Sequence, residues 1–180
     1  METVIELLHE GAKNHGDMPY LGGKNGDQWK TYSFVETDDL SSAFAAALIK
    51  YGLKKGDNIS ILSEGRPSWI IGEYGLLKAG CVSVPLSTKL LEDEIVFRLD
   101  HSESKAILVS ENCFQRAAEA LENINAKPLM IVISNRNPRL EDLVSKHTPA
   151  GANLLFFDDM IAQGQKLLEQ GGGLPQYGFR

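Results

Sequence analysis

Short apolar runs alternate with helical segments across the middle of this 180-residue chain. The strand-like runs span 58–63, 81–84, 106–109 and 129–133. Between them, apolar residues recur at helical spacing over 67–78, 91–99 and 114–124. Because parallel strands need long crossover connections, this order predicts right-handed βαβ units. We therefore expect an α/β fold, a layered sandwich in which helices cover a mainly parallel sheet.

A β-hairpin is predicted ahead of the first of these units. Its strands lie at 20–22 and 28–32, and the turn at 24–27 separates them. Asn25 and Gly26 in that turn supply the positive φ that tight hairpin turns require.

A helix is expected to follow the hairpin directly. Ser33 and Glu36 have the spacing of a capping box, in which each side chain satisfies a backbone N–H of the first turn. The helix is predicted to end near Lys50, with Gly52 as the stop signal. Its apolar stripe comprises Leu40, Phe44, Ala47, Leu48 and Tyr51.

The last quarter of the chain has a weaker pattern. Residues 135–153 are polar and predicted to be irregular, and a final helix is expected at 158–170. Gly171, Gly172 and Gly173 then begin a segment of linker composition. We interpret 1–170 as one incomplete subdomain and 171–180 as a linker or tail.

The composition excludes several classes of function. The net charge is -6, from 24 acidic and 18 basic residues, and such a surface repels phosphate backbones, so no nucleic-acid partner is expected. The sequence has no apolar run near the roughly 20 residues that span a bilayer and no basic signal-peptide start. Cys81 and Cys113 lie in apolar segments without CxxC spacing, which favours reduced core thiols and a cytoplasmic location.

No residue pattern indicates a nucleotide-phosphate or metal site. Gly22 and Gly23 fall in the hairpin, and Gly171 to Gly173 precede Pro175 without a following helix signal, so both runs are interpreted as loop or turn glycines. The histidines lack metal-ligand spacing and are interpreted as surface or helix-end residues. They are His9, His15, His101 and His147.

The remaining candidates also favour structural roles. The pairs Asp38–Asp39 and Asp158–Asp159 are placed at helix starts, where carboxylates complement the helix dipole. Cys81 and Cys113 lack the basic, exposed surroundings of reactive thiols. Arg66 and Trp69 could anchor this subdomain against another part of an enzyme, but the simpler interpretation makes Trp69 the first buried ring of an apolar helix. We accordingly predict no catalytic, cofactor-binding or metal-ligating residue in the chain.

Four short sequence motifs, called words below, occur in a fixed order, and the set as a whole is typical of one protein family. Residues 31–36 (TYSFVE) resemble a TYxEL element, and 51–57 (YGLKKGD) resemble a G-(L/V)-x-x-GD turn. Residues 63–69 (SEGRPSW) are similar to the word SENRPEW, and 77–86 (LKAGCVSVPL) match LKAGAVxVPL. The set resembles the first subdomain of the adenylate-forming superfamily of acyl-CoA synthetases, adenylation domains and luciferases. The SENRPEW word belongs to its long-chain fatty-acid branch.

The sequence also departs from that branch. Gly65 stands where an Asn is usual, Ser68 where a Glu is usual, and Ser87 to Lys89 replace a second proline after the VPL. The phosphate loop with its lysine, the ribose-binding aspartate and the C-terminal catalytic lysine of the superfamily have no counterpart in the sequence.

The resemblance implies a parent enzyme that uses Mg-ATP and CoA to activate a fatty acid through an acyl-adenylate. It implies that this chain alone is inactive and contains no cofactor site. The expected partners are the remainder of the parent chain, the fatty acid for the full-length enzyme, and further copies that associate through an exposed docking face. The parent is expected in the cytoplasm or at a membrane periphery. The alternative is a stand-alone, non-catalytic binding or assembly module derived from the same fold.

Overall fold

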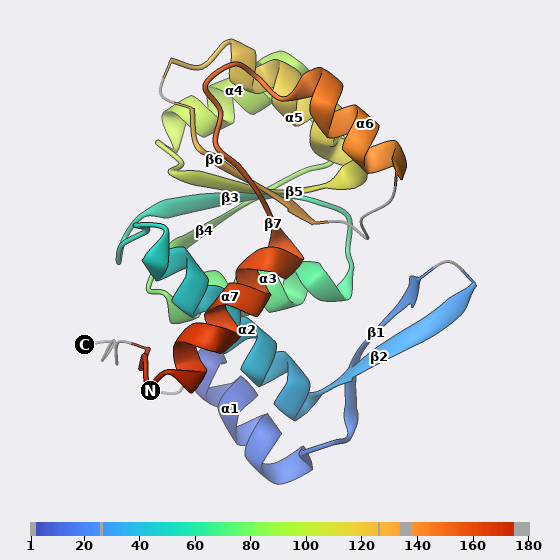
Figure 1. Cartoon of the computed structure of the whole chain (residues 1–180), viewed down its shortest axis with the longest axis vertical. Coiled ribbons are helices and arrows are strands. Elements are labelled where there is room, and N and C mark those ends of the chain that lie inside the picture. The colour runs from blue at the N-terminus through green and yellow to red at the C-terminus, as the bar shows by residue number, and fades with distance from the viewer. Residues whose placement is uncertain (1–2, 26, 126, 134–137, 175–180) are drawn as a thin grey trace. The chain divides into compact units, whose positions relative to one another are not determined.

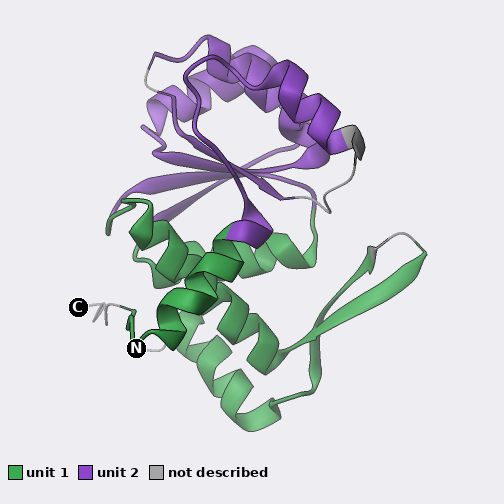
Figure 2. Cartoon of the chain, in the orientation of Figure 1, with its two compact units in different colours: residues 1–55, 65–80, 160–180 green, residues 56–64, 81–159 purple. Residues whose placement is uncertain are grey.

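The structure is a computed structural model that describes residues 3–25, 27–125, 127–133 and 138–174. The chain divides into two compact units, which are described separately (Figure 2). Unit 1 contains residues 1–55, 65–80 and 160–180, and unit 2 contains residues 56–64 and 81–159.

Unit 2 is built on a five-stranded parallel sheet with the strand order β4-β3-β5-β6-β7 (Figure 1). The central strands are buried and mainly apolar, as expected for a parallel sheet, with Ser60 and Ser110 as buried polar residues. In chain order the strands are β3 (Asn58–Leu62), β4 (Val82–Leu86), β5 (Ala106–Ser110), β6 (Leu129–Ile133) and β7 (Leu154–Phe156).

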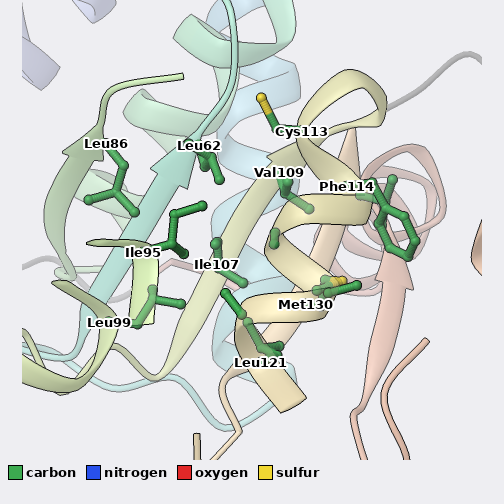
Figure 3. Close-up of a cluster of buried hydrophobic side chains, with 14 of the residues drawn as sticks. Leu62, Leu86, Ile95, Leu99, Ile107, Val109, Cys113, Phe114, Leu121 and Met130 are labelled. Atoms are coloured by element: carbon green, nitrogen blue, oxygen red, sulfur yellow. The ribbon is translucent and has the colours of Figure 1, made fainter. Parts of the chain in front are cut away.

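Three helices of unit 2 lie on one face of this sheet: α4 (Glu92–His101), α5 (Glu111–Glu122) and α6 (Pro138–His147) (Figure 1). The apolar stripes of α4 and α5 meet the strands in a continuous hydrophobic core. Figure 3 shows Ile95 and Leu99 of α4 and Phe114 of α5 in this core. Burial of this apolar surface is the main force that holds the unit together.

The segment predicted to be irregular, 135–153, is the clearest error of the sequence analysis. Residues 138–147 form α6, and the strand β7 follows at Leu154. Leu140 is buried and Leu143 and Val144 pack against the core, so the helical spacing was present within a polar segment. Residues 134–137 of this prediction lie outside the described part of the chain.

Unit 1 contains a hairpin and a group of helices. Its elements are α1 (Val4–His15), β1 (Pro19–Asn25), β2 (Gln28–Ser33), α2 (Phe34–Lys50), α3 (Pro67–Lys78) and α7 (Phe157–Glu169), the last from Met160 onward. The predicted capping box of α2 is confirmed, because Glu36 N donates to Ser33 Oγ at 3.1 Å and Ser33 N donates to Glu36 Oε2 at 2.7 Å. A second capping box, Thr3 with Glu6, begins α1, a helix that the sequence analysis did not predict.

Two glycines let helices approach α2 closely within unit 1. A Cβ at Gly75 of α3 would lie 2.7 Å from a ring carbon of Phe44 and 3.0 Å from the carbonyl oxygen of Ser41. A Cβ at Gly164 of α7 would lie only 1.8 Å from the carbonyl oxygen of Ala43. Small residues at these crossings allow the helices to pack backbone against backbone.

The two tryptophans differ in exposure. Trp29 on β2 is 69% exposed, in agreement with its position on the hairpin. Trp69 on α3 was expected to be largely buried but is only partly buried. The buried residues of α3 are instead Ile71, Gly72, Gly75 and Leu76, so the helix that looked apolar on all sides buries one face.

The α/β fold with a mainly parallel sheet is thus confirmed, together with the hairpin and the strand and helix order from 58 to 133. Within the described ranges, none of the helices has the length and apolar character needed to cross a membrane.

Candidate functional site

The carboxyl ends of β3 and β5 form the topological switch point of the sheet in unit 2. From β3 the chain continues to β4 on one side, whereas β5 pairs with β3 on the other. Ligands of open α/β sheets bind preferentially at such a point. Here Asn112 Nδ2 donates to Glu64 Oε1 at 2.8 Å, which joins the loop after β3 to the start of α5.

A buried hydroxyl and a buried thiol lie beside this point. Ser110 is the N-cap residue of α5, but its Oγ makes no side-chain cap bond; the Oγ is fully buried and interacts with the neighbouring Cys113 thiol. Burial raises the pKa of the Cys113 thiol, so it is a poor nucleophile near neutral pH. These two groups do not form a nucleophile–base pair.

Unit 1 contains a buried lysine whose ammonium group contacts several oxygen atoms. Lys78, at the end of α3, has a side chain that is 7% exposed. Its Nζ contacts four oxygens of α2: Asp38 Oδ1 at 2.6 Å, Asp38 O at 2.7 Å, Ser41 Oγ at 2.8 Å and Ser42 Oγ at 2.9 Å. Burial lowers the pKa of Lys78, and the bond to Asp38 opposes that shift.

This arrangement gives Lys78 a structural role rather than a catalytic one. An ammonium group has three N–H donors, and all of them face oxygens of α2. The cluster therefore ties α3 to α2. The prediction that Asp38 and Asp39 lie at a helix start is wrong, because both lie in the second turn of α2, where Asp38 binds Lys78.

The glycine runs have the turn and hairpin roles that were predicted. Gly22 and Gly23 lie in β1, paired with Thr31 and Lys30 of β2. Gly171 has φ +85°, its N–H donates to Leu168 O, and the N–H of Gly172 donates to Leu167 O, which is a Schellman cap of α7. The first residues of the expected linker therefore form a helix cap, in which two backbone N–H groups bond to α7. Residues 175–180 of the expected linker lie outside the described part of the chain.

The histidines are distributed over separate helices. His9 Nδ1 lies 3.2 Å from Asp38 Oδ2, the His15 ring lies against Phe34, and His101 stacks on Phe97 at 5.5 Å between ring centroids. His147 occupies the last turn of α6. Over the described residues, no group of three or more potential metal ligands comes together.

Two further predictions concern helix ends. Asp158 and Asp159 lie in the first turn of α7, as predicted. Arg66 is the N-cap residue of α3, where its carbonyl oxygen accepts the N–H of Trp69 at 2.9 Å, and Pro67 occupies the first helical position. Both Arg66 and Trp69 thus form part of a helix start.

Both cysteines are free and buried, in agreement with the sequence analysis. Burial raises the pKa of Cys81 to about 11, and the negative charge of Asp57 adds to the effect. We expect both thiols to react with Ellman's reagent far more slowly in the folded chain at pH 8 than in guanidinium chloride, because the thiolate is the reactive form. Reaction of either thiol in the folded chain at the rate of the unfolded chain would contradict this.

The chain matches the model of one protein family, AMP-binding enzyme, over residues 8–163. This chain therefore belongs to the AMP-binding enzyme family, the adenylate-forming superfamily that the four sequence words resemble.

Its curated relatives are considerably longer proteins. The chain is 25% identical over 173 residues to the Long-chain-fatty-acid–CoA ligase heimdall of Drosophila melanogaster, covering 94% of this chain and 24% of that protein. It is 26% identical over 170 residues to the peroxisomal Long chain acyl-CoA synthetase 6 of Arabidopsis thaliana, again 24% of the relative. The chain thus spans about a quarter of the length of these relatives.

Solved structures show the same fold. The adenylation domain of a carboxylate reductase from Mycobacterium chelonae superposes with a TM-score of 0.79 at 20% identity, covering 92% of this chain and 29% of that one. Coronafacic Acid Ligase from Pectobacterium brasiliense gives a TM-score of 0.73 at 25% identity, covering 90% and 30%. The α/β fold described above is therefore that of the N-terminal part of adenylation domains.

Proposed function

We propose that this chain forms the N-terminal part of an ATP-dependent fatty-acid–CoA ligase and does not catalyse the reaction by itself. The observation that carries the proposal is the family match over residues 8–163 in a chain that spans about a quarter of its curated relatives. The SEGRPSW word at 63–69 and the names of these relatives favour a long-chain acid as the substrate.

The proposed reaction of the parent has two steps. A carboxylate oxygen of the acid attacks the α-phosphorus of Mg-ATP, and pyrophosphate leaves, which gives an acyl-adenylate. The thiol sulfur of CoA then attacks the acyl carbon, loses its proton, and AMP leaves with the electron pair of the broken C–O bond. Activation is needed because a carboxylate is a poor electrophile until one of its oxygens becomes part of a good leaving group.

In the proposed parent enzyme, the described residues have a structural role. The switch point at Glu64 and Asn112 can position a neighbouring polar group, but the buried donors identified above, Lys78 and Ser110, do not form a triphosphate site. Phosphate binding requires clustered backbone N–H groups and a free cation. The backbone N–H groups of Gly171 and Gly172 already donate to carbonyl oxygens at the end of α7. We propose that the partner of this chain is the remainder of the parent enzyme. In the absence of that partner, the 180-residue chain self-associates.

The test is to express the reading frame with whatever sequence follows codon 180 and to measure ATP–pyrophosphate exchange. We expect exchange that depends on added fatty acid and is faster with a long-chain than with a short-chain acid. Exchange that is equal for both acids would contradict the long-chain substrate. A frame that closes after Arg180 would favour the non-catalytic module instead.

A further inference from the structure

A hollow lies in unit 2 where the start of α4 faces the end of α5. Its volume is about 590 Å³, and its lining comprises Leu91, Glu92, Asp93, Val96 and Asn123. Asn123 Nδ2 donates to Glu92 Oε1 at 2.9 Å, and this bond holds one wall of the hollow in place. We refer to these five residues as the α4–α5 groove.

Large apolar side chains are exposed beside this groove. Leu91 is 65% exposed and Phe97 is 64% exposed, although the same helix buries Ile95 and Leu99 in the core. Phe97 is one helical turn from Asp93, and Val96 is one turn from Glu92, so α4 presents apolar groups next to carboxylates along its outer side. Exposed apolar groups rimmed by polar ones are typical of protein interaction sites.

Carboxylates predominate on the α4 side of the groove, and on the α5 side Arg116 donates to Leu90 O, next to Leu91, at 2.7 Å. Helix α4 contains four carboxylates, Glu92, Asp93, Glu94 and Asp100, against one arginine, Arg98. Among the residues that the structure describes, no lysine or arginine forms an ion pair with the three carboxylates of the first turn. These charges complement the helix dipole, but they repel anionic membranes, nucleic acids and phosphorylated ligands.

We propose that the α4–α5 groove binds a basic amphipathic helix of a partner protein. One large apolar side chain of that helix fills the hollow against Leu91 and Val96, and its lysine or arginine side chains lie over Asp93 and Glu94. A second copy that docked its own α4 in the groove is a poor occupant, because carboxylates would then face carboxylates. The proposal is independent of the catalytic function proposed above.

The test measures fluorescence anisotropy of the 180-residue chain with a labelled amphipathic peptide of leucine and lysine. One control peptide carries glutamate in place of lysine, and another carries serine in place of leucine. We expect saturable binding of the leucine–lysine peptide only. Equal binding of the glutamate peptide, or no saturation of the leucine–lysine peptide up to about 1 mM, the weak end of specific affinities, would overturn the proposal.

Matched variants locate the binding site. Leu91→Ser with Asp93→Lys should weaken peptide binding at least about tenfold, as loss of an apolar anchor and its charge partner does. The control, Leu7→Ser with Asp17→Lys, makes the same chemical change at exposed residues of unit 1 and should leave affinity within about twofold. Phe97→Ser changes an exposed apolar residue beside the groove and is also expected to weaken binding. This variant replaces the double variant in the test if the double variant does not fold. Equal effects of groove and control variants would show non-specific attraction and overturn the proposal.

Discussion

Replacing Gly164 with alanine should lower the free energy of unfolding by about 3 kcal/mol or more, at the upper end of the range for overpacked cores. The added Cβ would lie 1.8 Å from the carbonyl oxygen of Ala43 and 2.5 Å from its carbonyl carbon. These are backbone atoms of α2, and neighbouring Phe44 is fully buried, so α2 cannot move aside without disturbing its own packing. Either α7 separates from α2 or the core of unit 1 is distorted.

Urea unfolding monitored by circular dichroism measures this loss. Gly65→Ala is the matched control, because Gly65 is exposed and a Cβ there meets nothing within 4 Å. The control should change stability by no more than about 0.5 kcal/mol. If both variants unfold at the same urea concentration as the unmodified chain, the close crossing of α7 and α2 is wrong.

Replacing Lys78 with methionine should also cost about 3 kcal/mol, the scale on which a buried ion pair is broken by removal of one partner. Asp38 would keep its carboxylate, which is only 16% exposed, without the ammonium group that now contacts it at 2.6 Å. In the double variant Lys78→Met with Asp38→Asn, the unpaired charge is gone, so part of the loss should be recovered. A double variant that loses as much stability as the sum of the two single losses, or more, would contradict a favourable interaction between these residues.

The stability difference between the unmodified chain and Lys78→Met should depend on pH. Burial lowers the pKa of Lys78 below 10.5, so in the window beneath 10.5 the unfolded chain binds more protons than the folded chain. Stability contributed by this residue therefore rises with pH through that window, and the difference between the two proteins should widen between pH 8 and pH 10. Burial raises the pKa of Cys81 to about 11, and burial with the hydrogen bond to Tyr20 raises that of Tyr74 to about 12; both groups are present in both proteins, so the comparison is made as a difference.

The parts of the fold that could be predicted were those that local sequence determines. β6 and the first four residues of β5 are uninterrupted apolar runs, and α2 begins at a capping box that is visible in four residues. Helix α6 was missed because its apolar residues, Leu140, Leu143 and Val144, lie in a polar segment that also contains Pro138. The three-residue strand β7 is too short to show any alternation.

The polar sites were harder to predict because they depend on residues far apart in the chain. Lys78 and Asp38 are 40 residues apart, and Asn112 and Glu64 are 48 apart, so neither pair produces a local motif. Trp69 was placed too deeply because a helix with apolar residues on all sides does not reveal which side is covered. By contrast, the family words are local, and the family itself could be identified from them before the fold was known.

This chain has the fold of the N-terminal part of adenylation domains, and we propose that by itself it has no working nucleotide site. Thermal melting with and without saturating Mg-ATP and a fatty acid, together with ATP–pyrophosphate exchange, tests this proposal most directly. A ligand at a hundred times its dissociation constant would add about 2.7 kcal/mol of stability and visibly raise the melting temperature. We predict an unchanged melting temperature and no exchange from the pure 180-residue chain. A shift of that size, or measurable exchange, would contradict the account and place an active site among these residues.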